Sequence, residues 1–254
     1  MNRALMGKRV LLTRTAKDND AWAKQLQAAG LVPIGHPCIT QEDLDAGGPL
    51  ATSLAMCTWL VLPSPKAVRR VAKLATVPAH VQIACVGPAS AEAAEVLLGR
   101  CDLVAERGTI AGLSAELAAR ILQNQASPPT ILIAGAEAGI DTSDHLLREA
   151  GANVQRLATY RTTPTRLESG QAPADLNAMG LDAILLGSPS ALVGLLNTAN
   201  VDEASGPILT LGPTTSDAVR AAGLREPVEA KAPSLDGLLE ALADLFPLHN
   251  FEAS

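Results

Sequence analysis

The chain has 254 residues, of which 48% are hydrophobic and 18% are charged, with a mean hydropathy of +0.20. This length fits one large domain or two ordinary ones, and the composition is too apolar for intrinsic disorder. Two Trp, two Phe, one Tyr and a net charge of −6 exclude aromatic stacking platforms and give little support to nucleic-acid binding.

The N-terminal region and the cysteines bear on cellular location and metal binding. Charges at Arg3, Lys8, Arg9 and Arg14 argue against a signal peptide, and no apolar run approaches the ~18 residues of a membrane span. Neither the cysteines nor the histidines are spaced as metal ligands. We therefore expect a cytoplasmic protein with free buried thiols, no metal, no cofactor and no membrane partner. The cysteines are Cys38, Cys57, Cys85 and Cys101, and the histidines are His36, His80, His145 and His249.

Short apolar runs alternate with helical patterns along the chain. The runs predict strands that are buried on both faces. Trp22, Leu26 and Ala29 share one face of the first predicted helix, and Gly30 suits its C-terminal end. Alternating strands and helices predict α/β architecture with doubly wound parallel sheets. The runs are VLLT (10–13), WLVL (59–62), IACV (83–86), ILIA (131–134), AILL (183–186) and ILTL (208–211).

The chain also repeats itself. WLVLPSPKAV (59–68) matches AILLGSPSAL (183–192), and IACVGPASAEA (83–93) matches ILTLGPTTSDA (208–218). Two further pairs of segments follow at offsets of 121 to 125 residues. A period this long predicts two copies of one domain rather than a solenoid.

The boundaries between the two predicted domains have two possible layouts. Residues 32–40 and 156–165 are β-prone, contain Pro and lie at the same place in each copy. As paired crossovers, they would give a discontinuous first domain (1–37 plus 163–254) and an inserted second domain (38–162). Each copy's opening βα unit would then complete the other domain. The competing layout is two tandem domains split near residue 127, and the repeat leaves both open.

Four turns after predicted strands have the chemistry of anion sites. Ser64 and Ser188 suit helix N-caps, each with Pro at the next position. Gly87 and Gly212 give tight turns, after which Ser90 and Thr215 (or Thr214, with Asp217) are expected to cap the following helices. Every βα turn needs a cap, so each one alone has an ordinary structural explanation. Together, at the carboxyl ends of strands, they predict one cleft that binds a large guest with several negative groups.

A few side chains add candidate chemistry. Tyr160, the only tyrosine, lies in the second crossover and suits ligand binding, general-acid catalysis or simple packing. Arg14 suits a carboxylate clamp or a solvated strand end. Lys66 and Arg161 add positive charge, and Glu137 and Asp141 follow the fourth strand. Neither a dinucleotide or nucleotide-triphosphate motif nor a nucleophile elbow is present.

The order of these motifs resembles the uroporphyrinogen-III synthase family over almost the whole chain. The resemblance rests on RVLLTR with AAG, SPKAV, VGPASAEA, the G-A-N-V…Y-R-T stretch that ends near Tyr160, SPSAL and LGPTTSDAVRAAG. It implies two α/β domains joined by a two-stranded linker, and cyclisation of hydroxymethylbilane to uroporphyrinogen III with inversion of ring D and loss of water. The substrate implied is a linear tetrapyrrole with eight carboxylates, handled without cofactor or metal by a chain we predict to be monomeric.

The resemblance also implies roles for individual residues. Tyr160 falls on the family's functional tyrosine. The chain departs from the family at Ala134 and Ile140, where arginines are usual, and at Pro63, where Thr is frequent. The alternatives are therefore a non-catalytic tetrapyrrole or polycarboxylate binder on the same fold and, by fold analogy alone, a two-domain binding protein or racemase for small acids. The predicted substrate-binding residues are Arg14, Ser64, Lys66, Gly87, Ser90, Gly135, Ser188, Gly212, Thr214 and Thr215.

Overall fold

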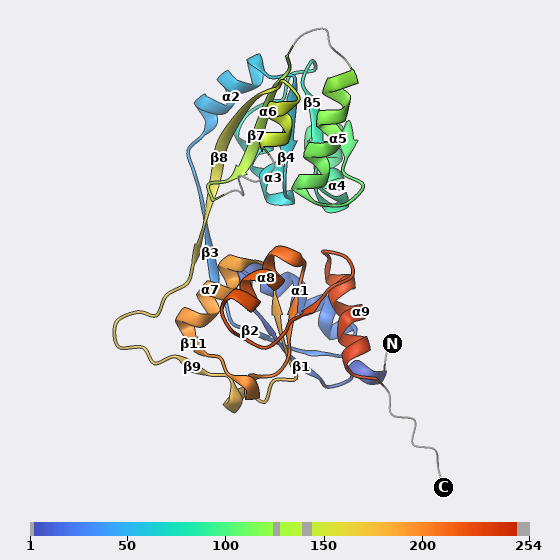
Figure 1. Cartoon of the computed structure of the whole chain (residues 1–254). Coiled ribbons are helices and arrows are strands. Elements are labelled where there is room, and N and C mark those ends of the chain that lie inside the picture. The colour runs from blue at the N-terminus through green and yellow to red at the C-terminus, as the bar shows by residue number, and fades with distance from the viewer. Residues whose placement is uncertain (1–2, 124–127, 139–143, 248–254) are drawn as a thin grey trace. The chain divides into compact units, whose positions relative to one another are not determined.

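The computed structural model describes residues 3–123, 128–138 and 144–247, and it divides the chain into two compact units (Figure 1). Unit 1 comprises residues 1–40 and 163–254, and unit 2 comprises residues 41–162. Each unit is built on a largely parallel sheet with helices on both faces, so the predicted α/β class is confirmed.

Unit 1 contains a five-stranded sheet in the order β13-β12-β10-β1-β2, with every neighbouring pair parallel. A short parallel pair, β9 and β11, was not predicted from the sequence. The elements are η1 (Arg3–Leu5), β1 (Arg9–Leu12), α1 (Ala16–Ala28), β2 (Val32–Gly35), β9 (Ala174–Asp175), η3 (Asn177–Met179), β10 (Ala183–Leu186), α7 (Pro189–Thr198), β11 (Ala199–Asn200), η4 (Glu203–Ser205), β12 (Ile208–Thr210), α8 (Pro213–Ala221), β13 (Val228–Glu229) and α9 (Leu235–Leu245).

Unit 2 contains a sheet in the order β3-β8-β7-β4-β5-β6. From β8 to β6 every neighbouring pair is parallel. The elements are β3 (Ile39–Asp43), α2 (Gly47–Met56), β4 (Trp59–Leu62), α3 (Pro65–Leu74), β5 (Gln82–Cys85), α4 (Pro88–Leu98), β6 (Leu103–Val104), α5 (Ile110–Gln123), β7 (Thr130–Ala136), α6 (Asp144–Glu149) and β8 (Asn153–Pro164).

Each of the two large sheets contains strands from both copies of the sequence repeat. The sheet of unit 1 joins β1 and β2, from the first copy, to β10, β12 and β13, from the second. The sheet of unit 2 joins β7 and β8, from the second copy, to β4, β5 and β6. Strands β3 and β8 are paired, and their contacts, from Cys38 with Thr165 to Leu44 with Thr159, step in opposite directions along the chain.

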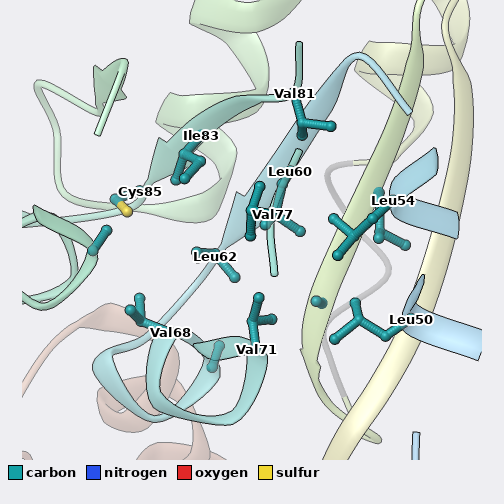
Figure 2. Close-up of a cluster of buried hydrophobic side chains, with 14 of the residues drawn as sticks. Leu50, Leu54, Leu60, Leu62, Val68, Val71, Val77, Val81, Ile83 and Cys85 are labelled. Carbon is teal, nitrogen blue, oxygen red and sulfur yellow. The ribbon is translucent and has the colours of Figure 1, made fainter. Parts of the chain in front are cut away.

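The apolar strands alternate their side chains between two core layers, as period-2 geometry requires. In unit 2, Leu60 and Leu62 of β4 pack with α2, α3 and α4, and Figure 2 shows them among Leu50, Val68 and Val71. Trp59 and Val61 pack on the opposite face with α5 and α6. Unit 1 repeats this plan, with α1 and α9 on one face and α7 and α8 on the other. Helices thus cover both faces of each sheet, so we expect ligand-binding residues at the ends of the strands.

Helix ends follow the predicted chemistry in part. Ser64 and Ser188 are N-caps, with Pro at the next position, and Gly30 and Gly151 adopt a positive φ of 93° just after α1 and α6. The expectation that Ser90, Thr214 or Thr215 caps a helix is wrong. Gly87 and Gly212 are the N-caps, because Pro88 and Pro213 begin α4 and α8 and draw the hydroxyl residues inside the first turn.

Candidate functional site

The only tyrosine lies near the carboxyl-terminal end of the parallel strands in unit 2. Tyr160 of β8 is 7% exposed, and its hydroxyl oxygen lies 3.1 Å from Ser64 Oγ, the N-cap of α3. Ser64 Oγ also accepts a hydrogen bond from the amide of Ala67 at 3.1 Å. Burial raises the pKa of the Tyr160 phenol, against the opposing effects of the Ser64 hydroxyl and the Arg69 charge. The phenol is therefore protonated at neutral pH and able to donate a proton.

Lys66 lies in the first turn of α3, beside this phenol. Its ammonium nitrogen is 4.9 Å from the centroid of the Tyr160 ring and 3.3 Å from Asp43 Oδ1. A cation over an aromatic face is stabilised by the ring quadrupole. Lys66 thus belongs to the site, but its charge is already paired.

The remaining predicted residues of unit 2 provide backbone rather than reactive groups. Gly87 opens α4 with an extended φ of −155°, and Ser90 is buried in the first turn of that helix. The Gly135 carbonyl, in β7, accepts a hydrogen bond from Thr159 Oγ1 at 3.2 Å. Gly87 and Ser90 thus lie at the start of a helix whose Ser90 amide already donates to the Gly87 carbonyl, and Gly135 lies in the strand next to β8.

An ion pair borders Tyr160 on the strand edge. Arg161 Nη2 donates to Glu137 Oε1 at 2.7 Å, and the Glu137 amide donates to the Tyr160 carbonyl at 2.9 Å. The hydrogen bond from Arg161 lowers the pKa of Glu137, so this carboxyl is ionised and paired rather than poised as an acid. Asp141, the second acid that follows the fourth predicted strand, lies outside the described residues, as does Ile140.

In unit 1 the predicted residues lie at the carboxyl-terminal ends of β1, β10 and β12. Arg14 Nη2 lies 3.3 Å from Asp18 Oδ2, and its guanidinium carbon is 4.4 Å from the Trp22 ring centroid. Ser188 Oγ accepts from the Ala191 amide at 3.2 Å. Arg14 is therefore held against α1 by an acid and an aromatic ring, and a ligand carboxylate would compete with Asp18 for it.

The Gly-Pro turn of unit 1 differs from the prediction in detail. Gly212 is the N-cap of α8, Thr214 is exposed and Thr215 is buried. Asp217, expected to form a capping box with Thr214, instead accepts a hydrogen bond from Arg220 Nη1 at 2.8 Å. The capping box is absent because Thr214 already lies inside the helix and cannot serve as its cap.

Several polar residues near these turns were missed from the sequence. Arg70, 6% exposed, donates to Asp43 Oδ2 at 2.9 Å, to the Leu44 carbonyl at 2.7 Å and to the Thr159 carbonyl at 3.0 Å. In unit 1, Ser216 Oγ lies 2.7 Å from Thr210 Oγ1 and donates to Glu229 at 2.6 Å. Single charged or hydroxyl residues form no motif that a sequence would reveal. The one usable indication was an arginine on the apolar face of α3, because a buried arginine needs partners.

A cavity of about 370 Å³ in unit 1 is lined by none of the predicted site residues. His36, Thr165, Arg166 and Thr198 are among its lining residues, and His36 Nε2 lies 2.9 Å from Thr198 Oγ1. Burial lowers the pKa of His36, which keeps the imidazole neutral. The cavity therefore contributes no partner to Tyr160 or to the four turns.

The cysteines are free thiols, as predicted, with Cys38, Cys57 and Cys85 buried and Cys101 partly buried. Burial raises the pKa of Cys38 to about 12 and that of Cys57 to about 11, so both are unreactive thiols. Across the described ranges 3–123, 128–138 and 144–247, no three His, Cys, Asp or Glu residues group as metal ligands. No helix in those ranges is both long and apolar enough to cross a bilayer.

Ala134, where the resemblance leads us to expect an arginine, is completely buried in β7 and belongs to the same core cluster as Tyr160. An arginine at this position would therefore have to be buried within that cluster. Among the described residues, the cations near Tyr160 include Lys66, Arg69, Arg70 and Arg161.

Comparisons with known proteins place the chain in a family. The model of "Uroporphyrinogen-III synthase HemD" matches residues 20–240. A mutant uroporphyrinogen III synthase from the extremely thermophilic bacterium Thermus thermophilus has 18% identity and a TM-score of 0.58, with 94% of this chain and 100% of that chain covered. The uroporphyrinogen-III synthetase of Helicobacter pylori 26695 has 16% identity and a TM-score of 0.59, with the same coverage.

At these identities, the similarity to the two structures shows the fold alone. No curated protein sequence gave a significant match. The family model, however, spans far more than half of the chain and includes the Ser-Pro turns, the Gly-Pro turns and Tyr160. The chain therefore belongs to the uroporphyrinogen-III synthase (HemD) family.

Proposed function

We propose that the chain is a cyclising carbon–oxygen lyase that converts hydroxymethylbilane to uroporphyrinogen III, with inversion of ring D and loss of water. One observation carries this proposal: the buried, protonated phenol of Tyr160 lies 3.1 Å from the Ser64 hydroxyl at the start of α3. A donor in this place suits departure of the substrate hydroxyl. Loss of that group leaves an electrophilic azafulvene, a step that the pyrrole itself drives.

The remaining task is to choose which carbon of ring D is attacked. Attack at the substituted carbon gives a spiro intermediate whose rearrangement inverts the ring, whereas unguided closure gives the symmetric isomer. A hundredfold preference needs about 2.7 kcal/mol of difference between barriers. A few hydrogen bonds from helix N-termini to substrate carboxylates are of this size. We propose that the turns at Ser64, Gly87, Ser188 and Gly212 supply them, with Arg14, Lys66, Ser90, Gly135, Thr214 and Thr215 beside them.

The wider assignments remain part of this proposal. They are a discontinuous first domain (1–37 plus 163–254), an inserted second domain (38–162), a cytoplasmic location and action as a monomer. The division into compact units at residues 40 and 163 supports the two domain ranges.

A second function is favoured by one specific observation. Arg14, Lys66 and Arg161 are each already paired with an acid, namely Asp18, Asp43 and Glu137. Cations that already have acidic partners are less available to orient an octa-anion for turnover, which favours a polycarboxylate binder without catalysis.

An isomer assay separates the two functions. Hydroxymethylbilane is generated enzymatically in the presence of the full chain, and the product is oxidised and resolved by isomer. The synthase gives the inverted isomer above the blank rate. Only the symmetric isomer, formed at the blank rate, would leave binding without catalysis.

A further inference from the structure

Three elements of unit 2 converge on one ammonium group. Lys66 of α3 places its nitrogen 3.3 Å from Asp43 Oδ1 of β3 and 4.9 Å from the centroid of the Tyr160 ring in β8. Its side chain is 21% exposed, so water screens these contacts only in part. The lysine is thus held between a carboxylate and an aromatic face.

The carboxylate is itself anchored by a buried cation. Arg70, one turn beyond Lys66 on α3, donates to Asp43 Oδ2 at 2.9 Å. Its other two nitrogens donate to the carbonyls of Leu44 at 2.7 Å and Thr159 at 3.0 Å. Because all three guanidinium nitrogens are committed and the side chain is 8% exposed, the position of Asp43 is fixed relative to the residue that precedes Tyr160.

We propose that Asp43 is a positioning residue for the catalytic phenol: anchored by Arg70, it holds Lys66 over the face of the Tyr160 ring. Without Asp43, the flexible lysine gains more from solvation than from the ring and leaves it. The consequence for turnover rests on the proposed function of Tyr160. The tether itself does not, since it depends only on contacts within unit 2.

The charged groups around the phenol give the expected sign. Burial raises the pKa of Tyr160, and the Ser64 hydroxyl and the Arg69 charge lower it. On our proposal, the Lys66 ammonium over the ring also stabilises the phenolate and so lowers this pKa. Arg69 on α3 acts in the same direction, and Arg161 and Glu137, from β8 and the end of β7, are paired with each other. Removing Lys66 therefore raises the pKa of the phenol, provided that Lys66 occupies its place over the ring.

The test is a double-mutant cycle read by spectroscopy. Tyr160 is the only tyrosine, so the phenolate absorbance of the full chain titrates this single group. Lys66→Met is introduced into the wild-type chain, into Asp43→Asn and into Asp45→Asn, an exposed acid two residues further on. Circular dichroism over the same pH range verifies the fold. If a variant unfolds before the phenol titrates, the carbon-13 shift of the labelled phenol carbon at neutral pH replaces the titration.

We expect Lys66→Met to raise the pKa of Tyr160 equally in the wild-type and Asp45→Asn backgrounds, and by less than half as much in Asp43→Asn. Equal shifts in all three backgrounds would show that Asp43 does not hold Lys66, and the absence of any shift would show that Lys66 does not act on the ring. Either result overturns the proposal.

Turnover supplies the second readout. Asp43→Asn is expected to lower kcat about fivefold with a smaller change in KM, the size available from one cation on an aromatic face. Asp43→Glu should restore part of the loss, and Asp45→Asn should leave kcat unchanged. Coupling in the titration together with full kcat in Asp43→Asn would keep the tether but overturn the proposal that Asp43 positions a catalytic phenol. A wild-type chain without turnover but with coupling would reject the proposed function alone.

Discussion

Helices α3 and α7 occupy the same place in the repeat, yet they hold the crossover segments in different ways. In unit 1, α7 has Gly194 at the contact, and any Cβ there would overlap the carbonyl group of Cys38. In unit 2 the aligned residue is Arg70, which reaches the backbone of Leu44 and Thr159 by hydrogen bonds. In unit 1 the backbone at Cys38 thus packs directly against α7, whereas in unit 2 the buried guanidinium of Arg70 joins α3 to the crossover segments.

The same contrast extends to the Ser-Pro turns. Ser64 and Ser188 cap their helices with matching bonds of 3.1 and 3.2 Å, but only Ser64 lies against a phenol. Strand β8 continues for 12 residues and brings Tyr160 to that turn, whereas its counterpart β2 ends after four residues at Gly35. The repeat therefore supplies two matching Ser-Pro caps, of which one lies beside a phenol.

The largest effect is expected from a change at the close contact between Gly194 and Cys38 in unit 1. Alanine is a better helix former than glycine by about 1 kcal/mol, yet Gly194→Ala is expected to lower the free energy of unfolding by about 3 kcal/mol because its methyl group overlaps Cys38. Urea denaturation measures the change. Gly48→Ala in α2, where a Cβ meets nothing within 4 Å, is the control and should not destabilise the chain. A stable Gly194→Ala variant would mean that the crossover does not pack directly on α7.

The next test concerns the reactive group that only unit 2 has. Tyr160→Phe keeps the ring and removes the donor, so kcat should fall about a hundredfold, or about 2.7 kcal/mol in the barrier. The assay is formation of the inverted isomer under saturating substrate. Thermal unfolding of the variant serves as the control, since the ring belongs to a buried core cluster. Full turnover in a folded Phe variant would remove Tyr160 from the mechanism.

A third test concerns a buried pair of hydroxyls in unit 1 that has no counterpart at the aligned positions of unit 2. Thr210 and Ser216 are both fully buried and share a 2.7 Å hydrogen bond, whereas the aligned residues of unit 2 are Cys85 and Ala91. Ser216→Ala leaves the Thr210 hydroxyl without this partner and should cost about 1–2 kcal/mol of unfolding free energy. Adding Thr210→Val should recover most of it, because the unpaired hydroxyl is then removed and the Glu229 carboxylate, which also loses the Ser216 donor, is exposed to water.

Urea denaturation of the single and double variants decides the point, with Thr214→Ala at an exposed position of α8 as control. The control is expected to stay within about 0.5 kcal/mol of the wild type. If the double variant is no more stable than Ser216→Ala, the cost arises from packing rather than from an unpaired hydroxyl.

These contrasts also show how far the sequence could lead. Apolar runs such as WLVL predicted strands correctly, because buried parallel strands leave little room for other residues. The caps at Ser64 and Ser188 were also predicted correctly, since local geometry and residue type decide them. The role of Tyr160 came from the family resemblance and stays a prediction. The error at Ser90 and Thr215 arose because a Gly-Pro pair places the N-cap three residues earlier, at Gly87 and Gly212.

What the sequence could not give is the pairing of distant groups. Arg70 contacts Asp43 and Thr159 only because β3 and β8 lie side by side, which no local pattern encodes. Gly194 likewise reads as an ordinary helix glycine until Cys38 is seen against it. Long-range contacts of single residues carry no periodic signal, so the positioning groups around Tyr160 emerged only from the structure.

The smallest effects are expected at the two N-caps, Ser64 and Ser188, which differ only in the phenol beside Ser64. Ser64→Ala and Ser188→Ala each remove one side-chain cap and should each cost about 1 kcal/mol of unfolding free energy. Their kinetics should differ: Ser188→Ala acts on KM through substrate binding, whereas Ser64→Ala also takes a partner from the Tyr160 hydroxyl and lowers kcat severalfold. Steady-state kinetics with urea denaturation of both variants measures the difference. An equal fall in kcat for the two would mean that the phenol draws nothing from Ser64, and the two units would then share the chemistry evenly.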